Sequence, residues 1–309
     1  MTIPAAGRWT TGGCIPGTGQ AAFRHTDPDD ARVPLVVAVP HAGRHYSDAL
    51  LAKLRNPSII PTELEDRLVD RVAVPAALQS GAAVIIADAP RAVIDLNRSP
   101  DDIDWSMIEG GAAIPGAPDG SKRARNGLGL IPRRIAGRGE LWRSRFSQAE
   151  LSSKLSEVHT PYHAALNFML MRIRQKWGAA MLVDVHSMPP LQQTHGTASV
   201  GFVVGDRFGA SCEPRHSAAM LRQIGEFGAT AALNRPYSGG YVLDRHGKPA
   251  KGRYAVQLEI CRSLYLDKSL AELSPRADTV ARQLAQLFAT LSEMTLDTDG
   301  ANEFRHAAE

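Results

Sequence analysis

The sequence is poor in cysteine, in long apolar runs and in net charge, and each shortage excludes a class of protein. Its 309 residues include three cysteines, Cys14, Cys212 and Cys261, which lie far apart and form no CxxC pair. A disulfide framework or a thiolate zinc site is therefore not expected, and the cysteine usage fits a reducing compartment. No window approaches the roughly 18 consecutive apolar residues of a membrane span, so we expect no membrane partner.

The charge balance argues against a nucleic acid partner. Lys and Arg number 35 against 32 Asp and Glu, a net charge of +3, and the basic residues are dispersed. The opening residues MTIPAAGRWTTGG lack a basic stretch followed by an apolar one, so we expect no signal peptide and a cytoplasmic protein. The phosphate-binding patterns GxGxxG after the first strand and GxxxxGK[ST] are missing, as is the GxSxG elbow. A nucleotide cofactor is not indicated, and a serine hydrolase is disfavoured.

Apolar runs typical of buried strands alternate along the chain with segments of helical periodicity. The expected strands span residues 34–43, 82–90, 92–100, 179–187, 198–206 and 253–265, and the expected helices span 62–81, 147–178, 216–233 and 274–294. Thr62 and Glu65 predict a capping box for helix 62–81, and Pro161 should divide or kink helix 147–178. The alternation predicts a single-domain α/β fold of three layers, α/β/α, with a mostly parallel mixed sheet.

The expected domain organisation follows from composition. Residues 1–32 read as an irregular lead-in, 33–294 as one catalytic α/β domain, and 295–309 as a polar tail. Within the domain, the Gly- and Pro-rich segment 99–140 predicts a long functional loop.

Chemically active side chains follow several of the expected strands. These are His41, Asn97 with Arg98, His186, and Glu259, which lies within its strand. Because parallel strands present their carboxyl ends at one edge, we expect these side chains to gather there. Taken singly, a histidine after a strand or an arginine in a loop has an ordinary structural explanation. Glu259 in an apolar strand is harder to explain so, because a buried carboxylate needs a partner or a shifted pKa.

Together these residue types suit metal-assisted hydrolysis. Two histidines and one carboxylate leave the fourth position of a tetrahedral zinc ion open for water, which the ion activates. A separate glutamate can move the proton, and an arginine fork can bind a substrate carboxylate. Asp184, two residues before His186, points to the same side of its strand and is expected to orient that imidazole. The residues therefore predict a hydrolase for an amide bond next to a carboxylate.

Eight stretches, in order along residues 33–270, resemble the N-formylglutamate amidohydrolase (N-formylglutamate deformylase) family. They are VPHAGRHY (39–46), EDRLVD (65–70), RAVIDLNRSP (91–100), GLGLIPR (127–133), PYHAAL (161–166), VDVHSMP (183–189), SGGYV (238–242) and QLEICRSLYLD (257–267). The family is similar to zinc carboxypeptidases and acylases, so the resemblance implies a zinc-exopeptidase-like (phosphorylase/hydrolase-like) fold. It also implies hydrolysis of N-formyl-L-glutamate to formate and L-glutamate, a step of histidine degradation.

The resemblance assigns roles at the metal site. His41 and His186 match ligands of one Zn²⁺ ion, with other divalent metals still open, and Glu259 matches the general base. Zinc carboxypeptidases use a compact HxxE ligand pair, which is missing after His41. The carboxylate ligand must therefore come from elsewhere, and we predict Asp66, with Glu65 as the second choice or as a supporting residue.

The resemblance also assigns the substrate side. Asn97 and Arg98 match a carboxylate-binding pair, and Arg91 is expected to polarise the scissile carbonyl or to hold a substrate carboxylate. Tyr241 and Gly240, in the SGGY turn, are expected to close over the substrate. The arginines available for the two carboxylates of the substrate are Arg44, Arg91, Arg98 and Arg133, and their assignment stays open.

Two alternatives remain beside this expectation. A related zinc-dependent deacylase or peptidase would act on another N-acyl amino acid or peptide, and the 99–140 loop would then border an open groove. A non-catalytic binding protein is disfavoured because the ligands and the base are all present. The expected partner is a small acidic N-acyl amino acid, and the expected state is a monomer or a small homo-oligomer.

Overall fold

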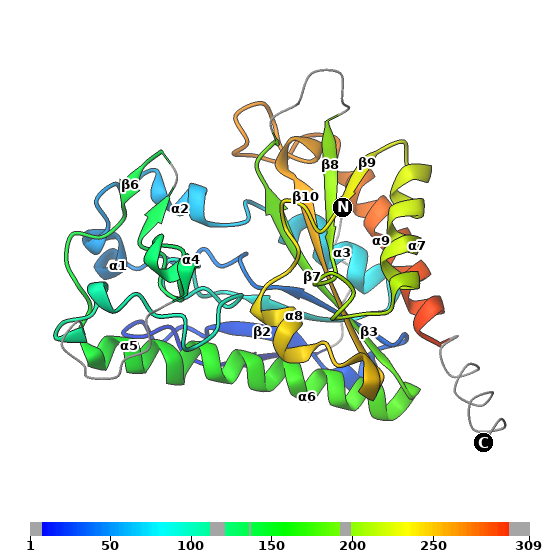
Figure 1. Cartoon of the computed structure of the whole chain (residues 1–309), viewed down its shortest axis with the longest axis horizontal. Coiled ribbons are helices and arrows are strands. Elements are labelled where there is room, and N and C mark those ends of the chain that lie inside the picture. The colour runs from blue at the N-terminus through cyan, green and yellow to red at the C-terminus, as the bar shows by residue number, and fades with distance from the viewer. Residues whose placement is uncertain (1–7, 112–120, 136, 192–198, 297–309) are drawn as a thin grey trace.

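The computed structural model describes residues 8–111, 121–135, 137–191 and 199–296. A mixed eight-stranded sheet runs through the molecule in the order β1-β2-β4-β3-β7-β10-β8-β9 (Figure 1). Its strands are β1 (Trp9–Gly12), β2 (Phe23–Thr26), β3 (Leu35–Val39), β4 (Ala83–Ala87), β7 (Ala180–Met188), β8 (Val200–Gly205), β9 (Thr230–Leu233) and β10 (Arg253–Cys261). The four central strands β4, β3, β7 and β10 are mutually parallel, and antiparallel pairings flank them. The predicted mixed, mostly parallel sheet is confirmed.

Helices cover both faces of this sheet. The helices are α1 (Asp48–Lys53), α2 (Ile60–Leu64), α3 (Asp70–Ser80), α4 (Lys122–Arg125), α5 (Gln148–Lys154), α6 (Thr160–Trp177), α7 (Pro214–Glu226), α8 (Tyr241–His246) and α9 (Ala277–Leu296). Helix α6 packs on one face, and α3, α7 and α9 pack on the other, which gives three layers. In Figure 1, α6 runs along the lower edge while α7 and α9 stand at the right. Of the helices that the structure describes, none is long and apolar enough to cross a membrane.

Alternation along β7 explains how an aspartate and a histidine end a buried strand. All nine residues of the strand are buried. Val183 and Val185 pack into the apolar cluster on the side of α3 and α9, whereas Leu182 belongs to the cluster on the side of α6. Because side chains alternate along a strand, Asp184 and His186 point to the same side as Leu182. On the α6 side of β7, apolar Leu182 is therefore followed by Asp184 and then by His186 toward the end of the strand.

The predicted helix 62–81 is wrong at its start. The chain forms α2, leaves the helical path at Glu65, and enters α3 at Asp70, so no capping box forms at Thr62. Leu68, with φ of 54°, turns the backbone between the two helices. The amide of Asp66 donates to the carbonyl of His41 at 2.9 Å, which ties this turn to the end of β3.

Three further expectations need correction. Segment 92–100 is a series of turns, not a strand, although its apolar side chains are buried. The predicted helix 216–233 ends as α7 at Glu226, and the chain continues through Gly228, with φ of 72°, into β9. Residues 1–32, expected to be irregular, contribute the edge strand β1 and its neighbour β2. These strands have only four residues each, too few for a clear period.

The predicted helix 147–178 forms, with an irregularity near Pro161. Helix α5 runs into a π-helical turn, η4 (Leu155–His159), which continues directly into α6. Pro161 occupies the first turn of α6, where its missing N–H is tolerated. Segment 99–140 contains the short helix α4 and a small hairpin of β5 (Arg134–Ile135) and β6 (Gly139–Glu140), and its residues 112–120 and 136 lie outside the described part.

Candidate metal centre and active site

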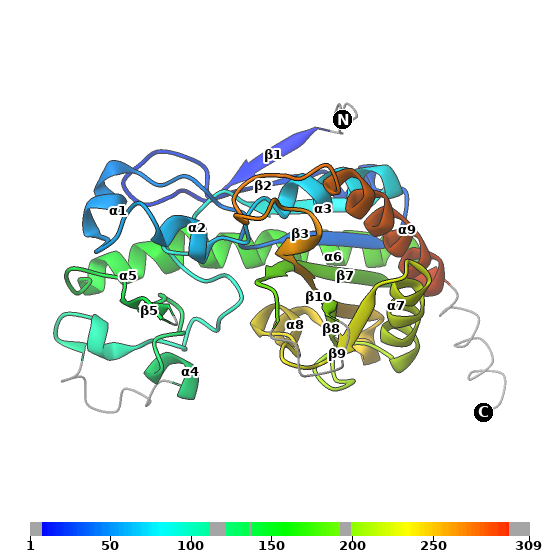
Figure 2. The same ribbon diagram turned by 90° about the horizontal axis from the view of Figure 1, so that it is seen from above.

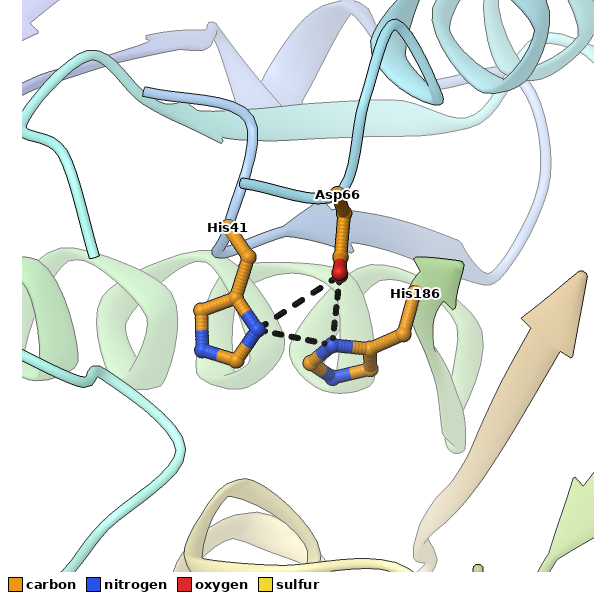
Figure 3. A group of neighbouring side chains, drawn as sticks. All are labelled: His41, Asp66 and His186. Atoms are coloured by element: carbon orange, nitrogen blue, oxygen red, sulfur yellow. Dashed lines mark hydrogen bonds and ion pairs between the residues drawn. The ribbon is translucent and has the colours of Figure 1, made fainter. Parts of the chain in front are cut away.

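Three buried donor atoms meet at the carboxyl ends of β3 and β7. His41 lies just after β3, His186 near the end of β7 and Asp66 between α2 and α3, and their side chains converge in Figure 3. The His186 Nδ1 atom lies 3.1 Å from Nδ1 of His41 and 3.0 Å from Oδ2 of Asp66. His41 Nδ1 lies 3.5 Å from the same oxygen. The structure thus brings the three predicted ligands together, and the carboxylate among them is Asp66.

The outer nitrogen of each imidazole is held by a carboxylate. His41 Nε2 lies 2.8 Å from Asp95 Oδ1, and His186 Nε2 lies 2.9 Å from Asp184 Oδ2. Since a carboxylate only accepts, each Nε2 carries a proton, and in the neutral ring Nδ1 presents a lone pair. Two lone pairs and the Asp66 oxygen then face one another and require a cation. Tetrahedral zinc, with ligands at about 2.0–2.2 Å, separates its donor atoms by about 3.3–3.6 Å, so a small adjustment of these side chains would admit a divalent ion.

Buried negative charge dominates this corner of the molecule. Burial alone lowers the pKa of His186, but the carboxylates of Asp184 and Asp66 raise it well above its ordinary value. Burial raises the pKa of Asp66, and hydrogen bonds with His186 and His41 more than offset this and lower it. Positive charge among the donor atoms is therefore stabilised, whether a proton or a metal ion carries it.

Glu259 stands beside the donor group because of strand register. In the parallel pairing of β7 with β10, Glu259 lies opposite His186 and Gln257 lies opposite Asp184. Gln257 Nε2 donates to Glu259 Oε1 at 3.0 Å. Burial, with the nearby charge of Asp66, raises the pKa of Glu259 to about 7. A carboxyl group that titrates near neutrality is suited to proton transfer.

The 91–98 segment forms the adjoining wall. Arg91 binds Asp95 Oδ2 through Nε and Nη2, both at 2.9 Å. Asn97 donates from Nδ2 to Gln257 Oε1 at 3.2 Å, and its Oδ1 accepts from the amide of Val242 at 3.0 Å. These contacts fix Asp95 behind His41 and fix Asn97 between β10 and α8.

A cavity of about 350 Å³ opens over the donor group. Eight of the predicted site residues line it: His41, Asp66, Arg91, Asn97, Arg98, His186, Gly240 and Glu259. A second cavity, of about 460 Å³, adjoins the first and shares several of its lining residues. The geometry therefore combines a cation site, a carboxyl group with a raised pKa and arginines around one hollow.

Gly240 and Tyr241 lie at the boundary of the two cavities. A Cβ atom at Gly240 would lie 2.5 Å from Asn97 Oδ1, so the absence of a side chain permits this close approach. Tyr241 lines the second cavity, and its hydroxyl accepts from Arg245 Nη1 at 2.6 Å.

Three other predicted residues have partners elsewhere. Arg44 forms two hydrogen bonds of 2.8 Å with Asp70. The side chain of Arg133 binds those of Asp104 and Glu140. The carboxylate of Glu65 accepts from Arg67 at 2.8 Å. In the described lining of the cavity over the donor group, Arg44, Arg133 and Glu65 do not occur.

Four residues of the site were not predicted from the sequence. Asp95 and Gln257 each lie two residues before a predicted site residue, a spacing that could have found Gln257 on its strand. Arg262, just beyond β10, donates to Ser187 Oγ at 3.1 Å. Arg123 comes from α4, far along the chain, and no local pattern indicates it.

A second group of histidines lies beneath residues 96–98. His163 Nε2 lies 3.0 Å from the carbonyl oxygen of Leu96, and His159 Nε2 lies 2.9 Å from that of Arg98. Since a carbonyl oxygen only accepts, both histidines donate, and His163 Nδ1 then accepts from His246 Nε2 at 3.0 Å. These three residues, the helix-side histidines, hold the backbone on either side of Asn97.

Comparison with known proteins identifies similar chains. The sequence model of the N-formylglutamate amidohydrolase family matches residues 33–266. The N-formylglutamate deformylase of Pseudomonas putida is 31% identical over 265 residues, which cover 82% of this chain and 92% of that protein. Its counterpart in Pseudomonas aeruginosa is 29% identical over 267 residues, with the same coverage of both chains.

Two solved structures are also similar to this chain. The crystal structure of N-formylglutamate amidohydrolase from Ralstonia eutropha is 31% identical in sequence, with a TM-score of 0.78, and the match covers 89% of this chain and 99% of that one. A gene product from Agrobacterium tumefaciens, 18% identical, has a TM-score of 0.62 over 90% of this chain and 96% of its own, a likeness of fold.

Proposed function

The chain belongs to the N-formylglutamate amidohydrolase family, and on this basis we propose that it hydrolyses the formyl amide bond of N-formyl-L-glutamate. The products are formate and L-glutamate. The observation that carries this proposal is the convergence of His41, Asp66 and His186 beside Glu259 at one cavity. Two imidazoles and a carboxylate, with a neighbouring glutamate, are the side chains that metal-assisted amide hydrolysis requires.

His41, Asp66 and His186 would hold one metal ion, and we propose zinc, because two imidazoles and one carboxylate form a typical ligand set of catalytic zinc. Such an ion polarises the amide carbonyl and lowers the pKa of a water molecule. Asp95 and Asp184 keep the proton on each Nε2, so that each Nδ1 faces the ion.

Glu259 moves the proton. It takes a proton from water as the oxygen attacks the formyl carbon, and it delivers that proton to the amide nitrogen as the C–N bond breaks. The nitrogen leaves as the amine of glutamate, and the formyl group becomes formate. A pKa of about 7 lets the carboxyl group perform both transfers near neutral pH.

Arg91 and Arg98 serve the substrate. Arg91 is anchored on Asp95 through Nε and Nη2, and it is placed to stabilise the oxygen of the scissile carbonyl. Arg98 donates to two backbone carbonyl oxygens, and with Asn97 it is placed to bind a carboxylate. The enzyme is therefore suited to an acidic N-acyl amino acid.

Formate release from N-formyl-L-glutamate by the zinc-loaded protein tests the proposal. We expect release that stops on chelation and returns with added zinc. The matched control is Glu259→Gln, which should retain zinc and lower kcat by about 100-fold or more, as expected for loss of a positioned acid–base group. A folded, zinc-loaded wild-type protein that releases no formate would contradict the proposed substrate.

The second cavity favours one other candidate, a deacylase for a larger N-acyl amino acid or peptide. It adjoins the first cavity with about 460 Å³ of additional space. A panel of N-acetyl, N-succinyl and peptidyl glutamates distinguishes the two. Faster turnover of a larger acyl compound than of the formyl compound would favour the alternative.

A further inference from the structure

Two arginines lie where the two cavities meet. Four residues line both hollows: Asn97, Arg98, Arg123 and Gly240. Arg98 comes from the segment that follows β4, and Arg123 comes from α4. Figure 2 shows α4 at the lower left, separated from α8, which carries lining residues on the other side. The junction is therefore bounded by segments that are distant in sequence.

Neither guanidinium group forms an ion pair with a carboxylate among the residues that the structure describes. Arg98 donates from Nε to the carbonyl of Leu128 at 2.8 Å and from Nη1 to that of Asn97 at 2.9 Å. The guanidinium of exposed Arg123 forms no hydrogen bond or ion pair with any residue that the structure describes. Asp101 and Asp102 line the second cavity, yet neither forms an ion pair with these arginines in the described ranges.

The two positive charges also oppose each other. Burial lowers the pKa of Arg98, and the charges of Arg91 and Arg123 lower it further, although the charges of Asp95 and Asp102 partly compensate. The other arginines of the two linings each lie near a carboxylate. Arg91 pairs with Asp95, Arg207 pairs with Asp244, and Arg262 Nη2 lies 3.8 Å from Asp66 Oδ1. Two cations that line the same junction of cavities suit an anion with two negative groups.

Backbone hydrogen bonds tie the segment that carries Arg123 to Arg98. Ser121 caps α4 by accepting from the amides of Arg123 and Ala124, both at 3.1 Å. The carbonyl of Arg123 accepts from the amide of Leu128 at 2.8 Å, and the carbonyl of Leu128 accepts from Arg98 Nε. Two hydrogen bonds therefore connect the backbone of Arg123 to the side chain of Arg98, which keeps the start of the Arg123 side chain near that guanidinium.

We propose that Arg123 binds the side-chain carboxylate of the substrate while Arg98 binds its α-carboxylate. Arg123 is then the residue that determines the preference for an acidic amino acid. The proposal rests on the proposed function, since it concerns the same substrate class. Half-buried Arg98, held by two carbonyl oxygens, suits the group that all N-acyl amino acids share. Exposed Arg123 suits the group that distinguishes glutamate from glutamine.

The test compares glutamate with its neutral isostere in two measurements. The first is kcat/KM for N-formyl-L-glutamate and N-formyl-L-glutamine, and the second is calorimetric affinity of the zinc-loaded protein for L-glutamate and L-glutamine. For the glutamate compounds, we expect Arg123→Gln to lower both kcat/KM and affinity by about 10- to 100-fold, the usual effect of one charge-assisted hydrogen bond. For the glutamine compounds, both values should stay unchanged. Arg98→Gln should weaken the binding of both L-glutamate and L-glutamine.

Arg125→Gln is the matched control. It removes the same charge from the same short helix, at an exposed residue outside the described lining of both cavities, and it should keep the preference. The proposal would be overturned if Arg123→Gln lowered the affinity for L-glutamate and L-glutamine equally, or lowered neither. It would also be overturned if the wild-type protein bound L-glutamate no more tightly than L-glutamine. Because binding is read without turnover, missing formate release would contradict the proposed function alone.

Discussion

The two groups of histidines in this molecule differ in the charge of their partners. At the metal centre, His41 and His186 each donate to a buried carboxylate. The helix-side histidines donate to backbone carbonyls or to one another, and no carboxylate binds them within the described ranges. Burial is similar in the two groups. The comparison shows that the partner on the far side of the ring decides whether a buried histidine attracts a cation or stays neutral.

The pKa values follow the same division. The carboxylates around His186 overcome its burial and raise its pKa well above the ordinary value. Burial lowers the pKa of His163 well below that value, and burial with the charge of Arg245 lowers the pKa of His246 to about 3. One group therefore prepares a cation site, whereas the other provides neutral donors that fix a backbone segment.

The largest effect should come from removing a histidine of the first group. His186→Ala should abolish zinc binding and lower kcat/KM by more than about a thousand-fold, because an ion that polarises the carbonyl contributes several kcal/mol. His163→Gln should retain full zinc content. Metal analysis of the two purified variants checks this, and the distinction would fail if both lost zinc to the same extent.

Removing a carboxylate partner should have an intermediate effect. Asp184→Asn still contacts His186 Nε2 but no longer supplies a charge, so zinc affinity should fall about 10- to 100-fold, as is usual for such supporting residues. Zinc competition with a chelator measures it. Unchanged affinity would mean that Asp95 and Asp66 alone make the site selective for a cation.

The helix-side histidines should act on position and stability. His163→Leu leaves the carbonyl of Leu96 without its donor and should cost about 1–3 kcal/mol in the free energy of unfolding. It should also raise KM more than it lowers kcat, since residues 96–98 carry Asn97 and Arg98, the proposed carboxylate-binding pair. His163→Gln can donate to the same carbonyl and should recover most of both losses. Denaturant unfolding and steady-state kinetics report the two effects.

The smallest effect is on the pH dependence of stability. His246 has a pKa of about 3 in the folded protein against about 6.5 in the unfolded chain, so the unfolded chain binds one more proton between these values. Stability from this residue is complete above pH 6.5 and falls as the pH drops, by about 1.4 kcal/mol per pH unit. His246→Gln should reduce the slope between pH 6 and pH 5 by that amount. An identical slope in both proteins would contradict the neutral assignment.

The sheet and half of the site could be predicted from the sequence because local patterns encode them. Apolar runs marked the central strands, and His41, His186 and Glu259 follow or belong to such runs. Helix 62–81 was wrong because a tertiary bond, from the Asp66 amide to the His41 carbonyl, outweighs helical periodicity. Segment 92–100 is apolar like a strand, yet Asp95 and Asn97 turn its backbone toward other elements.

The arginines illustrate what the sequence could not decide. Arg44, Arg98 and Arg133 look alike in sequence, and they differ because Asp70, Asp104 and Glu140 neutralise two of them. Those carboxylates are up to 29 residues away along the chain. Arg123 reaches the site because the segment after α4 bonds to residues 98–102: the Leu128 carbonyl accepts from Arg98, and the Leu130 amide donates to the Asp102 carbonyl. Such pairings depend on tertiary contacts, which no local period records.

The π-helical turn η4 has a consequence for the evolutionary record of this chain. A π turn holds one residue more than the α-helical turn it replaces. Deleting one residue from 155–159 would convert the π turn into an α-helical turn and join α5 and α6 into one regular helix. Because only the extra residue is removed, α6 would keep nearly its present orientation relative to α5, and His163 would still face Leu96. Related chains should therefore be able to lose or gain this one residue while they keep the histidine.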